Sequence, residues 1–179
     1  MEYTEVIHFW FAELETKQWW IKDVRLDQEI RNRFLDVHDQ AMNEMLKHWR
    51  SEPEGRLAEV IVLDQFSRNI FRDKPESFES DEKALNHAQA AIDAGADKEL
   101  VTGQRTFLYM PFMHSESPSV HERAVVIFSG PGMEGMLEFE LKHKKIIDRF
   151  GRYPHRNKIL GRESTAAELE FMETPDSSF

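Results

Sequence analysis

Residues 27–41 read Asp27-Gln-Glu-Ile-Arg-Asn-Arg-Phe-Leu-Asp-Val-His-Asp-Gln-Ala41. The apolar residues of this stretch recur at steps of three and four, which is the period of a helix with one buried face. The inward-facing stripe is predicted to consist of Ile30, Phe34, Val37, Ala41, Met45 and Trp49. We therefore expect a long helix here, opened by Asp23 or Asp27 as a capping residue.

The same helical period returns along the rest of the chain, whereas alternation of apolar and polar residues is nowhere sustained. Caps and breaks predict that further helices start at Thr4, after Ser51–Gly55, at Asp81, near Thr102, at Ser119, at Met133 or Glu134, and at Thr165. Gly95 and Gly151 are expected to end two helices, and Pro111 to end or kink a third. The expected fold is all-α, a tandem antiparallel array of about seven or eight helices. Residues 1–172 are expected to form one domain, and residues 173–179 a flexible tail.

The overall composition limits the classes of function. The chain has 179 residues and a formal net charge of −10, whereas general binders of nucleic acids or anionic membranes need a basic face. The absence of cysteine excludes disulfides, thiolate metal sites and cysteine nucleophiles. The first residues do not resemble a signal peptide, and no apolar run approaches the roughly 20 residues of a membrane span. We expect a cytoplasmic protein that binds neither nucleic acid nor membrane.

Positive charge is concentrated in one segment of this acidic chain, Arg149-Phe-Gly-Arg-Tyr-Pro-His-Arg-Asn-Lys-Ile-Leu-Gly-Arg162. It holds four arginines, one lysine and one histidine, and no acid. Two interpretations stay open: the arginines pair with internal carboxylates such as Asp64, Asp81 or Glu116, or they cradle a carboxylate or phosphate ligand. The candidate ligand-binding residues of the segment are Arg149, Arg152, His155, Arg156, Asn157 and Arg162.

A second group of donors lies in Leu63-Asp-Gln-Phe-Ser-Arg-Asn-Ile-Phe-Arg72. If the helix persists through this stretch, one face carries four candidate ligand-binding residues, Gln65, Arg68, Asn69 and Arg72. The alternative is a solvated face with an i,i+4 pair between Asp64 and Arg68, worth only about 0.3–0.5 kcal/mol.

A polar triplet, His114-Ser-Glu116, follows directly behind an apolar run. His114, Glu116 and His155 are the candidate acid–base residues, and His114 and Glu116 also join the predicted ligand site. A metal held by His114, Glu116, His143 and His155 would lack a diagnostic spacing, so we expect no metal and no cofactor. His143 alone, on an apolar helix face, is interpreted as a hydrogen-bonded core histidine.

The segment Gly130-Pro-Gly-Met-Glu-Gly135 fits the dinucleotide-binding pattern G-x-G-x-x-G. That pattern needs a strand before it and a second parallel strand after the following helix. Here a capping box precedes Val125-Val-Ile-Phe128, which predicts a helix. We therefore expect a turn between two helices.

Several longer motifs of the chain occur in the same order in one known family. They are Phe9-Trp-Phe11, Trp19-Trp20, Leu63–Arg72, Phe107-Leu-Tyr-Met-Pro-Phe-Met-His-Ser-Glu116 and Arg149–Arg162. From about Val6 to Met172 the chain resembles the bacterial domain-of-unknown-function 924 family. The resemblance implies a tetratricopeptide-like all-helical fold, a right-handed superhelix, and brings no biochemical activity with it.

Three hypotheses of function are consistent with these residues. The first is a helical binding module whose Arg/His/Asn-lined site takes a small anionic ligand or an acidic peptide. The second is a hydrolase- or lyase-type enzyme that uses His/Glu acid–base chemistry in the same cavity. The third is a tetratricopeptide-like scaffold for protein partners, with Trp19 and Trp20 in its groove. A homo-oligomer is compatible with all three, and whether the chain is an enzyme stays open.

Overall fold

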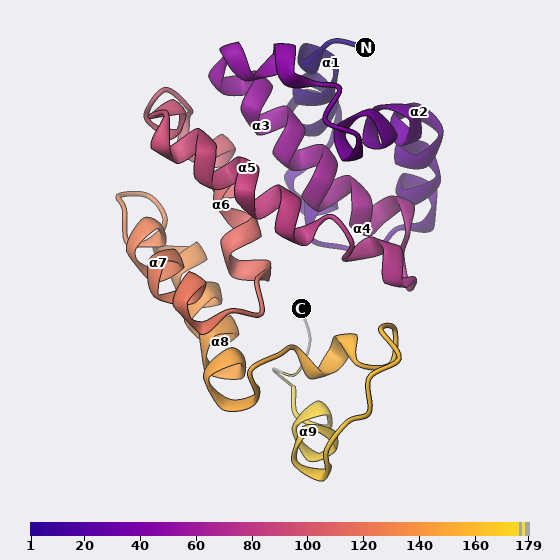
Figure 1. Ribbon diagram of the computed structural model, residues 1–179, viewed down its shortest axis with the longest axis vertical. Helices are drawn as coiled ribbons and strands as arrows, with labels where there is room; N and C mark the ends of the chain where they lie inside the picture. Colours follow the sequence, from indigo (N-terminus) through magenta and orange to yellow (C-terminus); the bar gives the residue numbers. More distant parts are fainter. Residues whose placement is uncertain (176, 178–179) are drawn as a thin grey trace. The chain divides into compact units, whose positions relative to one another are not determined.

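The computed structural model describes residues 1–175 and 177, and every regular element in that part of the chain is a helix (Figure 1). The α-helices are α1 (Tyr3–His8), α2 (Val24–Met42), α3 (Pro53–Ile61), α4 (Ser67–Ile70), α5 (Asp81–Asp93), α6 (Thr102–His114), α7 (Pro118–Phe128), α8 (Glu134–Phe150) and α9 (Ala166–Met172). The all-α prediction is therefore confirmed. The antiparallel array and the tetratricopeptide-like superhelix stay predictions.

The chain forms two compact units. The N-terminal unit comprises Met1–Arg72 and Glu76–Pro111, and the C-terminal unit comprises Asp73–Pro75 and Phe112–Phe179. The single domain expected over residues 1–172 stays a prediction, as does the flexible tail. Of that tail, Asp176, Ser178 and Phe179 lie outside the described residues.

Helix α2 begins as the sequence predicts and ends earlier. The carboxylate of Asp23 caps it, with Oδ1 accepting a hydrogen bond of 2.8 Å from the Arg25 N–H. The helix stops at Met42, and Glu44 then adopts a left-handed backbone conformation with φ 58°. This turn changes the direction of the chain, so Met45 is 64% exposed and the prediction that it faces inward is wrong.

Aromatic rings fill the core of the N-terminal unit. Phe34 lies 4.9 Å from Phe9 and 4.7 Å from Phe66 between ring centroids, and Trp10 lies 5.4 Å from Phe107. Helix α3 packs against both α1 and α5 and continues through a π-helical turn, Val62–Phe66, into α4. The helical path thus persists as far as Ile70, two residues before Arg72.

Two expected helix starts are wrong, and a third helix continues past the residue expected to end or kink it. Glu2 rather than Thr4 caps α1, because Glu2 forms a reciprocal capping box with Glu5. Helix α7 begins at Pro118, whose fixed φ suits the first helical turn, so Ser119 lies inside the helix. Helix α6 does not end at Pro111 but runs on to His114, and the kink expected as the alternative stays a prediction. This last turn buries Phe112 and Met113, at 1% and 2% exposed, which compensates for the hydrogen bond that proline removes.

In the C-terminal unit, α7 and α8 pack against each other. Residues 129–133 connect them, and Glu134 and Gly135 begin α8, which confirms the turn between helices in place of a dinucleotide loop. Gly151 ends α8 in a left-handed conformation, and Thr165 opens α9 with its capping box, both as predicted. The apolar spacing of α8 would place Phe139 on the same face as His143, Ile146 and Ile147, but Phe139 is 49% exposed, and Glu140 beside it is fully buried.

Candidate functional site

Tyr153 lies at the centre of the polar residues of the C-terminal unit. Gly151 turns the chain back after α8, and a short 3-10 helix, Pro154–Arg156, follows. The ring of Tyr153 is 1% exposed, and its hydroxyl donates a hydrogen bond of 2.6 Å to the carbonyl oxygen of Met113. Its backbone N–H donates to Oε1 of Glu116 at 2.7 Å. These bonds tie the Arg149–Arg162 segment to the end of α6 and the residues after it.

Histidines surround this tyrosine. The ring centroids of His121, His143 and His155 lie 6.4, 5.8 and 5.5 Å from that of Tyr153. Burial lowers the pKa of His143 to about 3, and repulsion from charge on His114, His121 and His155 contributes to that lowering. His143 is therefore neutral at neutral pH. Its Nδ1 donates to the carbonyl oxygen of Phe139 at 2.8 Å, which confirms the interpretation as a hydrogen-bonded core histidine.

Arg156 is held between His114 and Tyr153. Its side chain is mostly buried, with the residue 6% exposed, and Nη2 donates to the carbonyl oxygen of His114 at 2.9 Å. The guanidinium carbon lies 4.7 Å from the centroid of the Tyr153 ring, a cation–π distance. A planar cation is thus fixed beside two half-buried residues, His114 and His155.

Two other arginines of the segment form bidentate ion pairs inside the unit. Arg162 donates to both carboxylate oxygens of Glu116 at 2.7 and 2.9 Å, and Arg152 does the same to Glu168 at 2.7 and 2.9 Å. The pair between Arg162 and Glu116 is one of those that the sequence suggested. For these two arginines the interpretation as internal struts is supported.

The remaining residues of the segment have structural contacts as well. The guanidinium carbon of Arg149 lies 4.6 Å from the Phe150 ring centroid, and the residue is exposed. The buried Asn157 accepts from Nε of Arg162 at 2.9 Å and donates to Oγ of Ser164 at 3.0 Å. Asn157 therefore positions Arg162.

The other four predicted site residues lie in the N-terminal unit, where three acids receive their hydrogen bonds. Gln65 donates to Asp64 at 2.6 Å, and Arg68 lies 3.0 Å from both Asp64 and Asp81. The i,i+4 pair of Arg68 with Asp64 is thus confirmed.

Asn69 and Arg72 share a single acid, Asp27. Nδ2 of Asn69 and Nη2 of Arg72 donate to Oδ1 of Asp27 at 2.8 and 2.6 Å. Because Asp27 belongs to α2 and Arg72 follows α4, these bonds join two helices.

Sequence reasoning missed a buried pair of the C-terminal unit, His121 and Glu140, whose side chains are 2.7 Å apart. A signal for it was present, because Glu140 stands three residues before His143 and seven before Ile147 on the buried stripe of α8. An acid at that position of a helix needs a partner.

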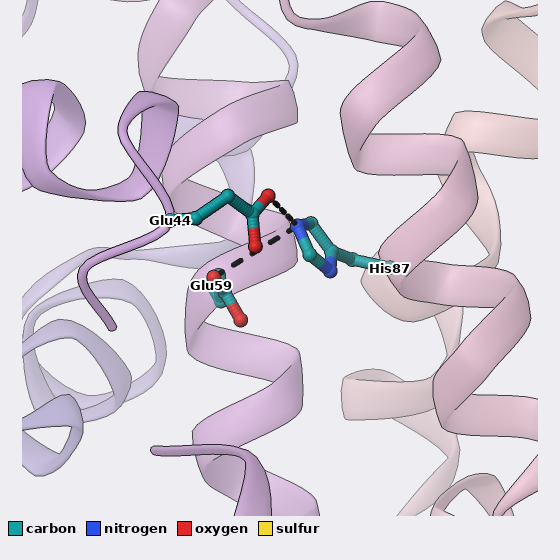
Figure 2. Close-up of side chains that lie close together, drawn as sticks. All are labelled: Glu44, Glu59 and His87. Atoms are coloured by element: carbon teal, nitrogen blue, oxygen red, sulfur yellow. Dashed lines mark hydrogen bonds and ion pairs between the residues drawn. The ribbon is translucent and has the colours of Figure 1, made fainter. Parts of the chain in front are cut away.

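A second missed group lies in the N-terminal unit. Glu44, Glu59 and His87 each offer a potential metal ligand, and the three atoms lie within 4.8 Å of one another. Figure 2 shows the two carboxylates and the imidazole pointing toward one another, from the turn after α2, from α3 and from α5. The sequence signal was Glu59, which is the only polar residue in the otherwise apolar run Leu57–Leu63.

Comparison with known proteins identifies the family. Residues 6–176 match a family described as bacterial protein of unknown function (DUF924), and the chain therefore belongs to that family. This confirms the resemblance that the sequence motifs indicated. A solved structure of a protein of unknown function from Agrobacterium tumefaciens is similar, with 34% sequence identity and a TM-score of 0.89 over 96% of each chain.

No curated protein matches the chain. Within the described residues, none of the helices has both the length and the apolar composition needed to cross a membrane.

Proposed function

We propose that the protein is a helical binding module that holds a small anion, or the carboxylate of an acidic peptide, at Arg156, His114 and His155. The observation that supports this most is that the guanidinium of Arg156 and the ring of His155 both lie against Tyr153, while the backbone carbonyl of His114 accepts a hydrogen bond from Arg156. Guanidinium and imidazole groups fixed in advance bind a carboxylate or phosphate at a lower cost in side-chain entropy.

The composition of the segment supports the same function, because the segment itself contains no acid. The Arg149–Arg162 segment carries five cationic side chains, and its two bidentate pairs involve two carboxylates, Glu116 and Glu168. Those pairs orient the loop. The proposed ligand site therefore contains fewer residues than the sequence suggested. Arg152, Asn157 and Arg162 hold the loop in place and do not contact the ligand.

Anion binding is tested by thermal unfolding in inorganic phosphate, sulfate and citrate, with chloride matching the ionic strength. A ligand at a hundredfold excess over its dissociation constant stabilises the folded state by about 2.7 kcal/mol. We expect the melting temperature to rise with one of these anions in the natural chain and in Arg149→Gln. We expect no rise in Arg156→Gln.

Arg149→Gln is a matched control, because it removes the same charge from an exposed position of the same segment. Since Arg156 is buried, His155→Gln provides a second variant that leaves the guanidinium in place. An equal loss of binding in Arg149→Gln and Arg156→Gln would mean that the anion responds to the total positive charge of the segment and not to a site at Arg156. Absence of any shift with all three anions in the natural chain would refute the proposal.

A second candidate is an acid–base enzyme of hydrolase or lyase type that uses His114, Glu116 and His155 at the same place. The observation in its favour is a chain of contacts from Glu140 through His121 to Tyr153, with 3.3 Å between Nε2 of His121 and the tyrosine hydroxyl. A carboxylate that orients an imidazole is a recurrent part of acid–base sites. His121 and Glu140 are fully buried, so they would position other residues rather than touch a substrate. A bell-shaped pH profile of turnover, abolished in His114→Ala, would establish this function.

The third candidate is a tetratricopeptide-like scaffold for protein partners. The cytoplasmic location and a homo-oligomeric state also stay predictions. Trp20 is 52% exposed, whereas the half-buried Trp19 donates to the carbonyl oxygen of Trp10 at 2.9 Å and stacks on the Trp10 ring. One of the two rings is thus accessible to a protein partner.

A further inference from the structure

The group Glu44, Glu59 and His87 lies in the N-terminal unit and is independent of the anion site proposed above. Nε2 of His87 is 3.1 Å from Oε1 of Glu44 and 3.9 Å from Oε1 of Glu59. The side chain of Glu59 is only 1% exposed, whereas that of His87 is 14% and that of Glu44 is 36% exposed. The group therefore reaches from a buried carboxylate toward solvent.

One cationic nitrogen already lies among these three side chains. Nη2 of Arg50 is 2.6 Å from Glu44, 2.7 Å from Glu59 and 3.4 Å from Nε2 of His87. A buried carboxylate such as Glu59 requires a positive charge beside it. Arg50, which is 23% exposed, supplies that charge from the short helix Lys47–Ser51.

The separations of the potential ligands match those of a metal site. Bonds of about 2.0–2.2 Å from zinc to nitrogen or oxygen place neighbouring ligand atoms of a tetrahedron about 3.3–3.6 Å apart. The two measured distances from His87, 3.1 and 3.9 Å, lie on either side of that range. All three potential ligand atoms lie within 4.8 Å of one another.

We propose that Glu44, Glu59 and His87 bind a divalent transition-metal ion of the zinc class, and that Arg50 takes the place of this ion when it is absent. One imidazole and two carboxylates suit Zn²⁺ or Mn²⁺ better than Mg²⁺ or Ca²⁺, which prefer oxygen ligands alone. The ion and the guanidinium exclude each other, because both occupy the point where the three ligand atoms converge. Lys83, whose Nζ lies 3.3 Å from Oε1 of Glu44, would have to withdraw together with Arg50.

The geometry of Glu59 supports this exchange, because its Oε1 lies 2.7 Å from Nη2 of Arg50 and 3.9 Å from Nε2 of His87. The exchange of cations leaves Glu59 compensated in both states, so the fold tolerates either one.

Calorimetric titration of the full chain with Zn²⁺ and with Mn²⁺, after treatment with a chelator, tests the site. We expect one ion per chain in the natural protein. Loss of an outer-sphere partner lowers metal affinity by about 10–100-fold, so loss of a direct ligand in His87→Ala or Glu59→Gln should lower it at least as much. His48→Ala is the control, because His48 is an exposed histidine of the same unit.

The variant Arg50→Met tests whether the guanidinium competes with the metal ion or only stabilises the three ligand side chains. If the guanidinium and the ion compete, this variant binds Zn²⁺ more tightly than the natural chain. It should also melt at a lower temperature in chelator and regain stability when Zn²⁺ is added. In the double variant Arg50→Met with His87→Ala, Zn²⁺ should restore little stability.

Two results would contradict the proposed metal site. Zinc that binds the natural chain but is unaffected by His87→Ala and Glu59→Gln would place the ion elsewhere. Binding in Arg50→Met alone would mean that the natural chain keeps its arginine there and holds no metal. Either outcome overturns the proposal.

Discussion

Nδ1 of His121 lies 2.7 Å from Oε1 of Glu140, and both side chains are fully buried. The other ring nitrogen, Nε2, is 2.8 Å from the carbonyl oxygen of Ser115 and must carry a proton, because a carbonyl only accepts. The contact between Nδ1 and Oε1 therefore contains one proton shared by the pair. Burial raises the pKa of Glu140, against the opposing influence of His121 and Lys144, so the folded protein holds this proton more strongly than the unfolded chain.

The stability of the Glu140→Gln variant, relative to that of the natural chain, should increase as the pH rises. A glutamate whose pKa is raised by folding stabilises the protein below its ordinary pKa of 4.5 and loses that contribution as the pH rises through the folded value. Glutamine does not titrate, and its amide can donate to Nδ1 of His121. We expect the free energy of unfolding of the variant, relative to the natural chain, to improve between about pH 4 and pH 8. Urea unfolding across this range measures it, with the exposed Glu138→Gln as control. A difference that does not change with pH would contradict the assignment.

Glu168→Gln should weaken the acid sensitivity of the fold. The hydrogen bonds of Arg152 lower the pKa of Glu168 to about 2, so its contribution is present above pH 4.5 and lost as the pH falls toward 2. At neutral pH we expect the variant to lose about 1.5–3 kcal/mol, the usual value of a hydrogen bond to a charged group. Its stability should then fall less steeply in acid. Glu170→Gln removes the same charge from an exposed position of α9 and should leave the profile unchanged.

Alanine should have opposite effects at two glycines. A Cβ at Gly55 would lie 2.0 Å from the carbonyl oxygen of Trp49, which is backbone and cannot move aside. Gly55→Ala is therefore expected to destabilise the fold by more than about 3 kcal/mol. A Cβ at Gly103, within α6, meets nothing within 4 Å, so Gly103→Ala should be neutral or stabilising by up to about 1 kcal/mol. Chemical denaturation of both variants provides the comparison, and equal effects would refute the close contact at Gly55.

Asp27 and Arg72 should be coupled energetically. Their bidentate contact joins α2 to the end of α4, and neither side chain is more than about a quarter exposed, at 13% and 25%. A double-mutant cycle with Asp27→Asn and Arg72→Met should give a coupling of about 0.5–3 kcal/mol, as for residues in direct contact. Additive effects of the two substitutions would indicate that Arg72 does not act as a strut, and would return it to the candidate ligand donors.

The start of α2 and the ends of α5 and α8 follow from nearby residues. Asp23 caps backbone groups two and three positions later, and Gly95 and Gly151 adopt the left-handed conformation that favours glycine. The prediction failed where local signals competed. Thr4 and Glu2 are both acceptable caps, and the choice between them depended on Glu5. Met45 has the correct spacing for the stripe of α2, but the helix ends before it.

The candidate sites were less accessible to sequence reasoning. The pair Asp64–Arg68 could be predicted, because residues four apart on a helix always face each other. The pairs Arg72–Asp27 and Arg162–Glu116 join residues 45 and 46 positions apart, and no local pattern specifies such partners. For the same reason the sequence showed the concentration of arginine but left open what it binds.

Sequence alone therefore established the all-helical class, most of the caps and the family, because helical hydrogen bonds and apolar periodicity are set within a few residues. Which charges meet across different helices was decided only by the tertiary structure. Glu59 and Glu140 are ordinary helix residues in the sequence, and they become buried acids with fixed partners only when α3 packs on α5 and α7 packs on α8. Burial removes water from these carboxylates, and the partner that each then requires, Arg50 for Glu59 and His121 for Glu140, comes from another helix.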